Sequence, residues 1–94
     1  MKTNERNVIV RTFSAGVHYG RLVEQRDKHV VLTQARRIWS WRERNTLHEI
    51  SLRGVGKGSR VSEEIARIEL TEAIEILNCT PEAVANLNSP AEWK

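Results

Sequence analysis

Residues 17 to 33 read VHYGRLVEQRDKHVVLT and contain the pattern that decides the fold. From Val17 to Gln25, apolar and polar side chains alternate, as they do in a strand with one buried face. The polar residues 26–28 then provide a turn, and the β-branched run 29–33 follows directly. Two strands joined by so short a connection pair antiparallel, so this stretch predicts a β-hairpin. Gly20, inside the first strand, predicts a bulge or a sharp bend.

A strand is expected before the hairpin and an extension after it. Residues 7–12, NVIVRT, form a β-branched run that ends at a Ser-Ala-Gly turn. If the second hairpin strand continues over residues 34–42, its side chains alternate between two faces. One face would carry Arg37, Trp39 and Trp41, and the other Arg36, Ile38 and Ser40. The first face would combine a cation with two indole rings, and Ile38 would lie in the core.

Two short helices are predicted from their caps. Thr46 and Glu49 have the spacing of a capping box, in which the threonine side chain accepts the amide three residues on. Thr80, followed by Pro81 at the first helical position, begins a second helix. Trp93, near the end of the chain, would fold back onto the domain. The residues expected to bury one side of each helical piece are Leu47, Ile50 and Val55 for the first and Ala83, Val84 and Leu87 for the second.

Residues 62–77 fit both a helix and a strand. Helix-forming residues dominate the segment, and Ser62 has the character of a helix cap. Four even-numbered positions nevertheless carry aliphatic side chains, which fits the two-residue period of a strand better than the period of a helix. We therefore predict a strand from Ile68 to Leu77. Its inner face would bear Ile68, Leu70, Ile74 and Ile76.

These elements predict a mainly β fold with some helix (α+β), built as a single small domain over residues 1–94. A chain of this length forms only one hydrophobic core and buries about 60–65% of its unfolded surface. Association into a homo-oligomer would bury more, and we expect it. The sequence shows neither a membrane span nor a secretory signal. Cys79, the single cysteine, has no intrachain disulfide partner, which suits a cytoplasmic protein.

Charge is divided unevenly along the chain. Residues 1–60 contain 13 Lys and Arg against 5 acidic residues, whereas residues 61–94 contain 2 against 7. The basic part could bind a polyanion, or the two parts could neutralise each other within the fold or across a subunit contact. The net charge of +3 therefore decides nothing about nucleic acid.

We expect no catalytic or metal-binding motif in this chain. Its candidate metal ligands are scattered without the spacing of zinc motifs: His18, His29, His48 and Cys79. Asp27 is the only aspartate and lies in the predicted turn, while the glutamates between residues 63 and 75 fit a solvated strand face. We predict a protein that is not an enzyme and that holds neither a metal nor a cofactor.

Residues 53–60, RGVGKGSR, form a glycine-rich loop with three cations, Arg53, Lys57 and Arg60. Its backbone amides and cations could bind a phosphate. The spacing differs from that of a phosphate-binding P-loop, because Gly58 stands where Ser or Thr should follow the Gly-Lys pair. The alternative is a flexible connection without regular structure.

Residues 35–41, ARRIWSW, carry the strongest functional signal. Indole rings stack on nucleobases and guanidinium groups pair with phosphates, so this stretch could hold one nucleotide. The alternative is that the tryptophans are large side chains of the core or of a subunit interface, with the arginines packed beside them. The predicted ligand-binding residues are Arg36, Arg37, Trp39, Trp41, Arg53, Lys57 and Arg60.

Two resemblances rest on these stretches. Residues 19–35, YGRLVEQRDKHVVLTQA, look like the bent second strand, turn and third strand of SH3-like or Sm-like barrels. This implies such a barrel as the alternative to a small antiparallel sheet. The segments VIVRTFSAGVHYGRL, VVLTQARRIWSW and LTEAIEILNCT, with the closing EWK, resemble uncharacterised small proteins of bacteriophages and prophages. The chain departs from that family at residues 42–44, where a charged run replaces a short link.

The phage resemblance implies an accessory protein made in the cytoplasm of a bacterial host. Joined to the cluster of cations and indoles, it predicts a non-catalytic protein that sequesters a nucleotide immune signal, such as a cyclic oligonucleotide or an ADP-ribose derivative. The alternative is a macromolecular binder, either an Sm-like RNA- or DNA-binding module or an inhibitor that docks on a host protein. The expected partner is thus a small nucleotide, with nucleic acid second and no membrane.

Overall fold

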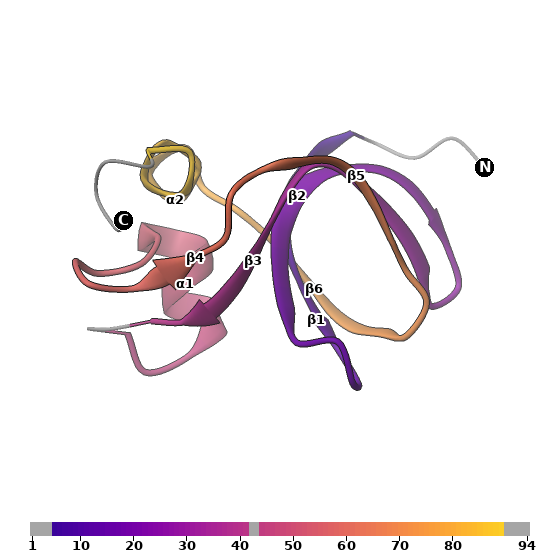
Figure 1. Cartoon of the computed structure of the whole chain (residues 1–94), viewed down its shortest axis with the longest axis horizontal. Helices are drawn as coiled ribbons and strands as arrows, with labels where there is room; N and C mark the ends of the chain where they lie inside the picture. Colours follow the sequence, from indigo (N-terminus) through magenta and orange to yellow (C-terminus); the bar gives the residue numbers. More distant parts are fainter. Residues whose placement is uncertain (1–4, 42–43, 90–94) are drawn as a thin grey trace.

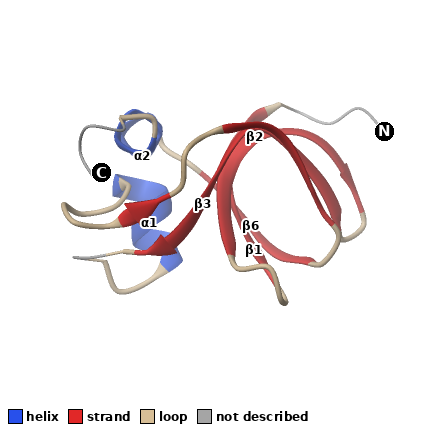
Figure 2. Cartoon of the chain, in the orientation of Figure 1, coloured by secondary structure: helices blue, strands red, loops and turns tan. Residues whose placement is uncertain are grey.

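The computed structural model describes residues 5–41 and 44–89. Within that part of the chain, strands dominate and the predicted mainly β class is confirmed (Figures 1 and 2). The strands are β1 (Arg6–Thr12), β2 (Val17–Arg26), β3 (His29–Ser40), β4 (Arg60–Val61), β5 (Ile65–Leu70) and β6 (Ala73–Asn78), and the helices are α1 (Leu47–Arg53) and α2 (Pro81–Leu87).

The strands form one antiparallel sheet. The hairpin of β2 and β3, which the sequence predicted, lies at its centre, and Arg26, expected in the turn, pairs with His29. β1 pairs with β2, and β6 returns to the far side of β1. On the other side, β3 pairs with β5 along its first half and with β4 along its second. No pairing joins β5 to β6 in the described ranges, so the sheet is open, not a closed barrel.

The sheet buries side chains on both faces, and β1 shows this most simply. Val8 and Val10 point to one face and Ile9 to the other, and all three are fully buried. We call the first cluster the inner core; it comprises Val8, Val10, Leu22, Val30, Leu32, Ala35, Leu70 and Ala73. We call the second the helix core; it comprises Ile9, Tyr19, Ile38, Ile50, Val55, Val61 and Leu87.

The sheet curls around the inner core (Figure 1), and Gly20 lies where the pairing of β2 and β3 is irregular. The register between β2 and β3 shifts between Tyr19 and Arg21, which confirms the predicted irregularity. A Cβ atom on residue 20 would lie 3.0 Å from the carbonyl oxygen of Thr33 and 3.1 Å from Cβ of Leu32. Glycine therefore allows an approach of the two strands that a side chain would crowd.

The predicted strand from Ile68 to Leu77 is right in type and wrong in extent. β5 ends at Leu70 and β6 begins at Ala73, because the chain turns to bring β6 beside β1. Ile68, Leu70 and Ile76 pack in or against the inner core, as expected. Ile74 is half exposed instead, since the register with β1 shifts at this point and leaves Ile74 as an extra residue on β6.

Both helices begin at their predicted caps and lie together at one end of the molecule (Figure 2). The Thr46 side chain accepts the amide of Glu49 at 3.3 Å, and Thr80 accepts the amide of Ala83 at 3.2 Å. Glu49 reaches back one residue further than expected and accepts the amide of Asn45 at 3.0 Å. Ile50 and Leu87 bury the inner sides of the helices in the helix core. The expectation for Trp93 lies outside the described residues.

Candidate ligand grooves

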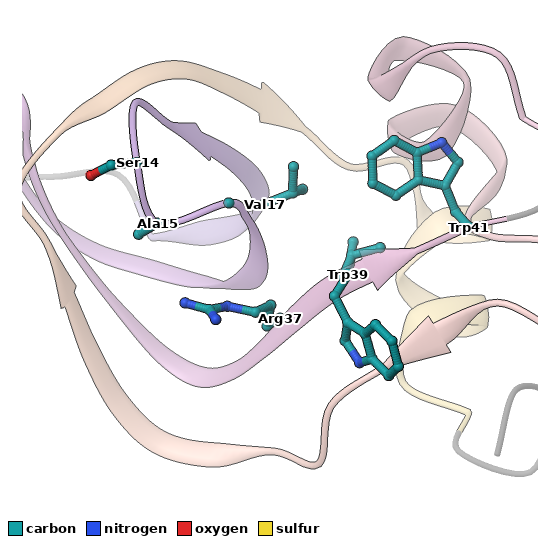
Figure 3. A pocket seen from close by; sticks show the side chains of 8 residues that line it. Ser14, Ala15, Val17, Arg37, Trp39 and Trp41 are labelled. Atoms are coloured by element: carbon teal, nitrogen blue, oxygen red, sulfur yellow. The ribbon is translucent and has the colours of Figure 1, made fainter.

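The end of β3 and the turn before β2 enclose a groove of about 420 Å³, which we call the tryptophan groove (Figure 3). One wall is the turn and the first residue of β2, residues 14–17. The opposite wall belongs to β3 and to the residue after it. It consists of Arg37, Ile38, Trp39 and Trp41. Three of the seven predicted ligand-binding residues thus meet in one depression.

A bulge in β3 decides how the two indole rings lie. Ile38 pairs with Val61 and Ser40 with Arg60, so Trp39 is an extra residue in this strand. An extra residue disrupts the alternation of side chains. The prediction that Trp39 and Trp41 share a face is therefore wrong, and Figure 3 shows the rings pointing in different directions.

The two tryptophans differ in exposure as a result. Trp39 is 61% exposed, whereas Trp41 is half-buried and packs against the helix core that contains Ile38. Ile38 is buried, as predicted. Trp41 is therefore largely a packing residue, whereas the indole of Trp39 is exposed to solvent.

Arg37 has a fixed backbone and an accessible side chain. Its amide donates to the Ser62 hydroxyl at 2.8 Å, and the Ser62 amide donates to its carbonyl oxygen at the same distance. The side chain is exposed, and no carboxylate in the described ranges forms an ion pair with its guanidinium group. Its positive charge is therefore available to an anion in the tryptophan groove.

A second groove of about 270 Å³ also has Arg37 in its lining, and we call it the arginine groove. Arg36, which the sequence placed beside Arg37, is only 10% exposed here. Its Nη1 donates to the carbonyl oxygen of Ser62 at 3.2 Å, and its Nη2 lies 3.7 Å from a carboxylate oxygen of Glu64. The lining residues are His18, Ala35, Arg36, Arg37, Ser62, Ile65 and Ile68.

His18 is a buried polar residue in the arginine groove. Its Nε2 lies 2.9 Å from the carbonyl oxygen of Ala15, and its ring is 2% exposed. Burial lowers the pKa of His18 below its usual value, the bond to Ala15 opposes this, and the nearby charge of Arg37 lowers the pKa further. The imidazole is therefore neutral at pH 7.

A third groove of about 430 Å³ adjoins the tryptophan groove, with Val17 and Trp41 lining both. We call it the helix groove, because residues 45–48 at the start of α1 form one wall. Arg11 and Glu75, which face each other across β1 and β6, form the other. Its lining mixes both signs of charge.

The predicted residues of the glycine-rich loop lie apart from these grooves. Arg53, Lys57 and Arg60 line none of the three. Arg53 lies 4.0 Å from a carboxylate oxygen of Glu49 on α1. Arg60 lies on β4 opposite Ser40, one strand away from Trp39. The sequence therefore grouped cations that the fold separates.

The loop itself is held by hydrogen bonds. The Asn86 side chain accepts the amide of Val55 at 2.8 Å and donates to its carbonyl oxygen at 3.0 Å. The amides of Gly54 and Ser59 donate to the carbonyl oxygens of Ile50 and Gly56. Three amides that a phosphate would need are thus already bonded within the chain, which disfavours the predicted phosphate site. The hydrogen bonds at Gly54 and Val55 also argue against a flexible connection in the first part of the loop.

Sequence reasoning missed the turn at residues 14–17 and His18, Ser62 and Ile65 as groove residues. The predicted hairpin did contain a signal for two of them. Counting outward from the predicted turn at residues 26–28 places Val17 and His18 opposite Arg37 and Arg36. The observed turn is one residue shorter, because Arg26 pairs with His29, and it places them opposite Ile38 and Arg37. Ser62 and Ile65 gave no such signal, because nothing near them in the sequence indicates pairing with β3.

Other reactive groups do not gather at the grooves. Burial raises the pKa of the Cys79 thiol to about 12, so it is protonated at neutral pH. Within residues 5–41 and 44–89, no three His, Cys, Asp or Glu side chains lie close enough to hold a metal ion. Neither described helix has the length and apolar character needed to cross a membrane.

Comparison with protein families gives one match. Residues 5–87 match the model of a family described as Domain of unknown function (DUF6948). The chain belongs to the DUF6948 family. The expectation that most of the chain resembles an uncharacterised family is confirmed by this match. No curated protein and no solved structure matches this DUF6948 chain.

Proposed function

We propose that this DUF6948 chain is a non-catalytic protein that binds a small nucleotide in the tryptophan groove. The observation that carries the proposal is the exposed indole of Trp39 in one groove with the accessible guanidinium of Arg37. A base stacked on an aromatic ring contributes about 1–3 kcal/mol, and arginine binds phosphate through two parallel hydrogen bonds. The groove volume of about 420 Å³ falls within the usual range for small-molecule sites.

The biological role that we propose is sequestration of a nucleotide immune signal. In this proposal the protein is a phage-encoded accessory protein in the cytoplasm of a bacterial host, and it acts as a homo-oligomer. The support is the sequence resemblance to phage and prophage proteins together with the tryptophan groove. Sequestration needs a binding site and no catalytic group, which fits a groove built from arginine and indole side chains. The native mass of the assembly tests the oligomeric state.

Isothermal titration against a panel of nucleotides tests the binding proposal. The panel contains mononucleotides, ADP-ribose and cyclic di- and trinucleotides. We expect at least one to bind at micromolar concentration, and Trp39→Ala and Arg37→Ala to weaken it about tenfold or more. Absence of heat with every nucleotide would overturn the proposal.

Two control variants match these substitutions. Phe13→Ala removes an aromatic ring that is 78% exposed and lines none of the three grooves. Arg53→Ala removes an exposed cation that lies outside them as well. Both controls should retain the affinity of the unmodified protein, so loss of binding in the controls would place the site elsewhere.

A second candidate function is the binding of single-stranded RNA or DNA, as in Sm-like modules. Exposed arginines on three strands of the sheet favour it, namely Arg11, Arg37 and Arg60. Gel shifts across a salt series test this candidate, because binding to a polyanion weakens steeply as salt rises. If neither the titration nor the gel shifts detect binding, docking on a host protein is the remaining proposal.

A further inference from the structure

Arg37 lines two grooves at once, the tryptophan groove and the arginine groove. We infer that the ligand is a dinucleotide unit, with one base on Trp39, the phosphodiester group at Arg37 and the second base in the arginine groove. This inference rests on the proposed nucleotide-binding function. It adds the class of ligand and a second base site, which Ile65, Ile68 and His18 line.

The arginine groove has the chemistry of a base site. The carbonyl oxygen of Ala15 can only accept a hydrogen bond, so the Nε2 atom that contacts it carries the proton of the neutral His18 ring. Nδ1 is then an acceptor, and the part of the chain that the structure describes gives it no hydrogen bond. A base that reached this acceptor would meet it with an N–H donor, and every nucleobase carries such a donor.

The walls and size of the arginine groove fit one base. Ile65 and Ile68 line it, and Ile65 is 47% exposed, so a planar ring would cover apolar surface of Ile65 that water now contacts. Its volume of about 270 Å³ lies just below the range of about 300–1,000 Å³ typical of sites for drug-sized ligands. The groove therefore suits a base and not a complete second nucleotide.

Arg37 is the cation placed to bind the linking phosphate. Arg36 also lines the arginine groove, but its guanidinium group contacts the Ser62 carbonyl oxygen and the Glu64 carboxylate. Arg37 stands on the boundary of both grooves, on a backbone that Ser62 holds from two sides. A phosphodiester at this boundary would leave one base on each side.

The test is isothermal titration with matched probes. The dinucleoside monophosphates ApA, UpU, GpG and CpC are compared with the four corresponding nucleoside 5′-monophosphates. At least one dinucleotide should bind about tenfold or more tightly than its monophosphate, although the monophosphate carries more negative charge.

A variant in the mouth of the arginine groove locates the second base. Replacing His18 would disturb a buried residue, so the exposed Ile65 is changed instead, and Ile65→Glu replaces an apolar side chain of the arginine groove by a charged one. Ile65→Glu should remove the dinucleotide advantage and leave mononucleotide affinity within about twofold. The matched control is Ile74→Glu, because Ile74 is similarly exposed and lines none of the three grooves.

The outcomes separate this inference from the function on which it rests. Mononucleotides that bind as tightly as every dinucleotide would overturn the inference and keep the proposed function. A dinucleotide advantage that survives Ile65→Glu, or that Ile74→Glu removes equally, would also overturn the second base site. Absence of binding by all eight probes would overturn the function and the inference together.

Discussion

The two halves of β3 belong to one strand and are used differently. In residues 29–35, Val30, Leu32 and Ala35 are buried in the inner core, and the strand pairs with β5 along this half. In residues 36–40, only Ile38 is buried, and pairing with the two-residue β4 contains a bulge. The half paired with β5 is framework, whereas the half paired with β4 exposes Arg37 and Trp39 to the grooves.

The difference shows what frees a side chain for binding. Pairing with β5 continues without a shift from Val30 to Ala35, and the alternation at Val30 and Leu32 sends their side chains into the inner core, where packing uses them completely. The extra residue at Trp39 breaks that alternation, so a large aromatic side chain remains outside both cores. Ser62 keeps the backbone of this half in place through Arg37. The strand that lines the groove therefore contains a bulge, and hydrogen bonds to Ser62 still fix its backbone at Arg37.

The sharpest test of the comparison truncates one large side chain in each half. Leu32→Ala removes a fully buried side chain of the inner core and should lower the free energy of unfolding by about 2–5 kcal/mol. Trp39→Ala should lower it by about 0.5 kcal/mol or less, since most of the indole is in water. Urea denaturation measures both. Equal losses would mean that Trp39 is a core residue in solution.

A substitution at Gly20 tests the irregular pairing of β2 with β3 between the two halves of β3. Gly20→Ala places a Cβ atom against the Thr33 carbonyl oxygen and the Leu32 side chain. This crowding should lower the free energy of unfolding by about 1–3 kcal/mol, because β2 and β3 must move apart. Urea denaturation again gives the value. A variant as stable as the unmodified protein would show that this position tolerates a side chain.

The hydrogen bond from the Arg37 amide to Ser62 should contribute less to stability than the core side chains do. Ser62→Ala deletes the hydroxyl that accepts the Arg37 amide at 2.8 Å and should lower the free energy of unfolding by about 0.5–1.5 kcal/mol. Amide hydrogen exchange at Arg37 should quicken, while exchange at Val30 and Leu32 should follow only the global change. Exchange at Arg37 that does not respond would contradict the assigned role of Ser62.

The smallest expected effect is the pH dependence from His18. Its pKa is lowered in the folded state, so the unfolded chain binds a proton more readily as pH falls through 6.5. The stability contribution of the neutral ring is therefore present above pH 6.5 and is lost as pH falls through the folded pKa. His18→Gln should show a smaller loss of stability between pH 7.5 and 5.5 than the unmodified protein does.

A control for the pH prediction uses another histidine. His29 lies on the surface, 3.1 Å from a carboxylate oxygen of Glu69. The His29→Gln variant reports how much of the slope comes from a surface histidine. If His18→Gln leaves the pH dependence unchanged while His29→Gln alters it, burial of His18 is not its source.

The sequence predicted the parts of the fold that depend on neighbouring residues. The hairpin turn before His29 and the helix caps at Thr46 and Thr80 are local signals, and all three are confirmed. The bulge at Trp39 is different, because it depends on β4, which lies twenty residues further along the chain. The turn between β5 and β6 was hidden by aliphatic residues that continue with the same period across it.

The candidate site was predictable to a similar degree. Residue type alone identified Arg37, Trp39 and Trp41, and the fold gathers them in one groove. Residue type could not separate Arg36 from Arg37, because their difference arises from Ser62 and Glu64. The glycine-rich loop likewise depends on Asn86, about thirty residues away, whose side chain holds Val55.

The most direct test of nucleotide binding follows the indole N–H signal of Trp39 by NMR during titration with each nucleotide of the panel. Its assignment comes from the signal that disappears in Trp39→Phe. We predict that one nucleotide moves the Trp39 signal along a saturating curve and that Arg37→Ala flattens this curve. A Trp39 signal that stays in place while a nucleotide binds, or that no nucleotide moves, would contradict the assignment of the groove.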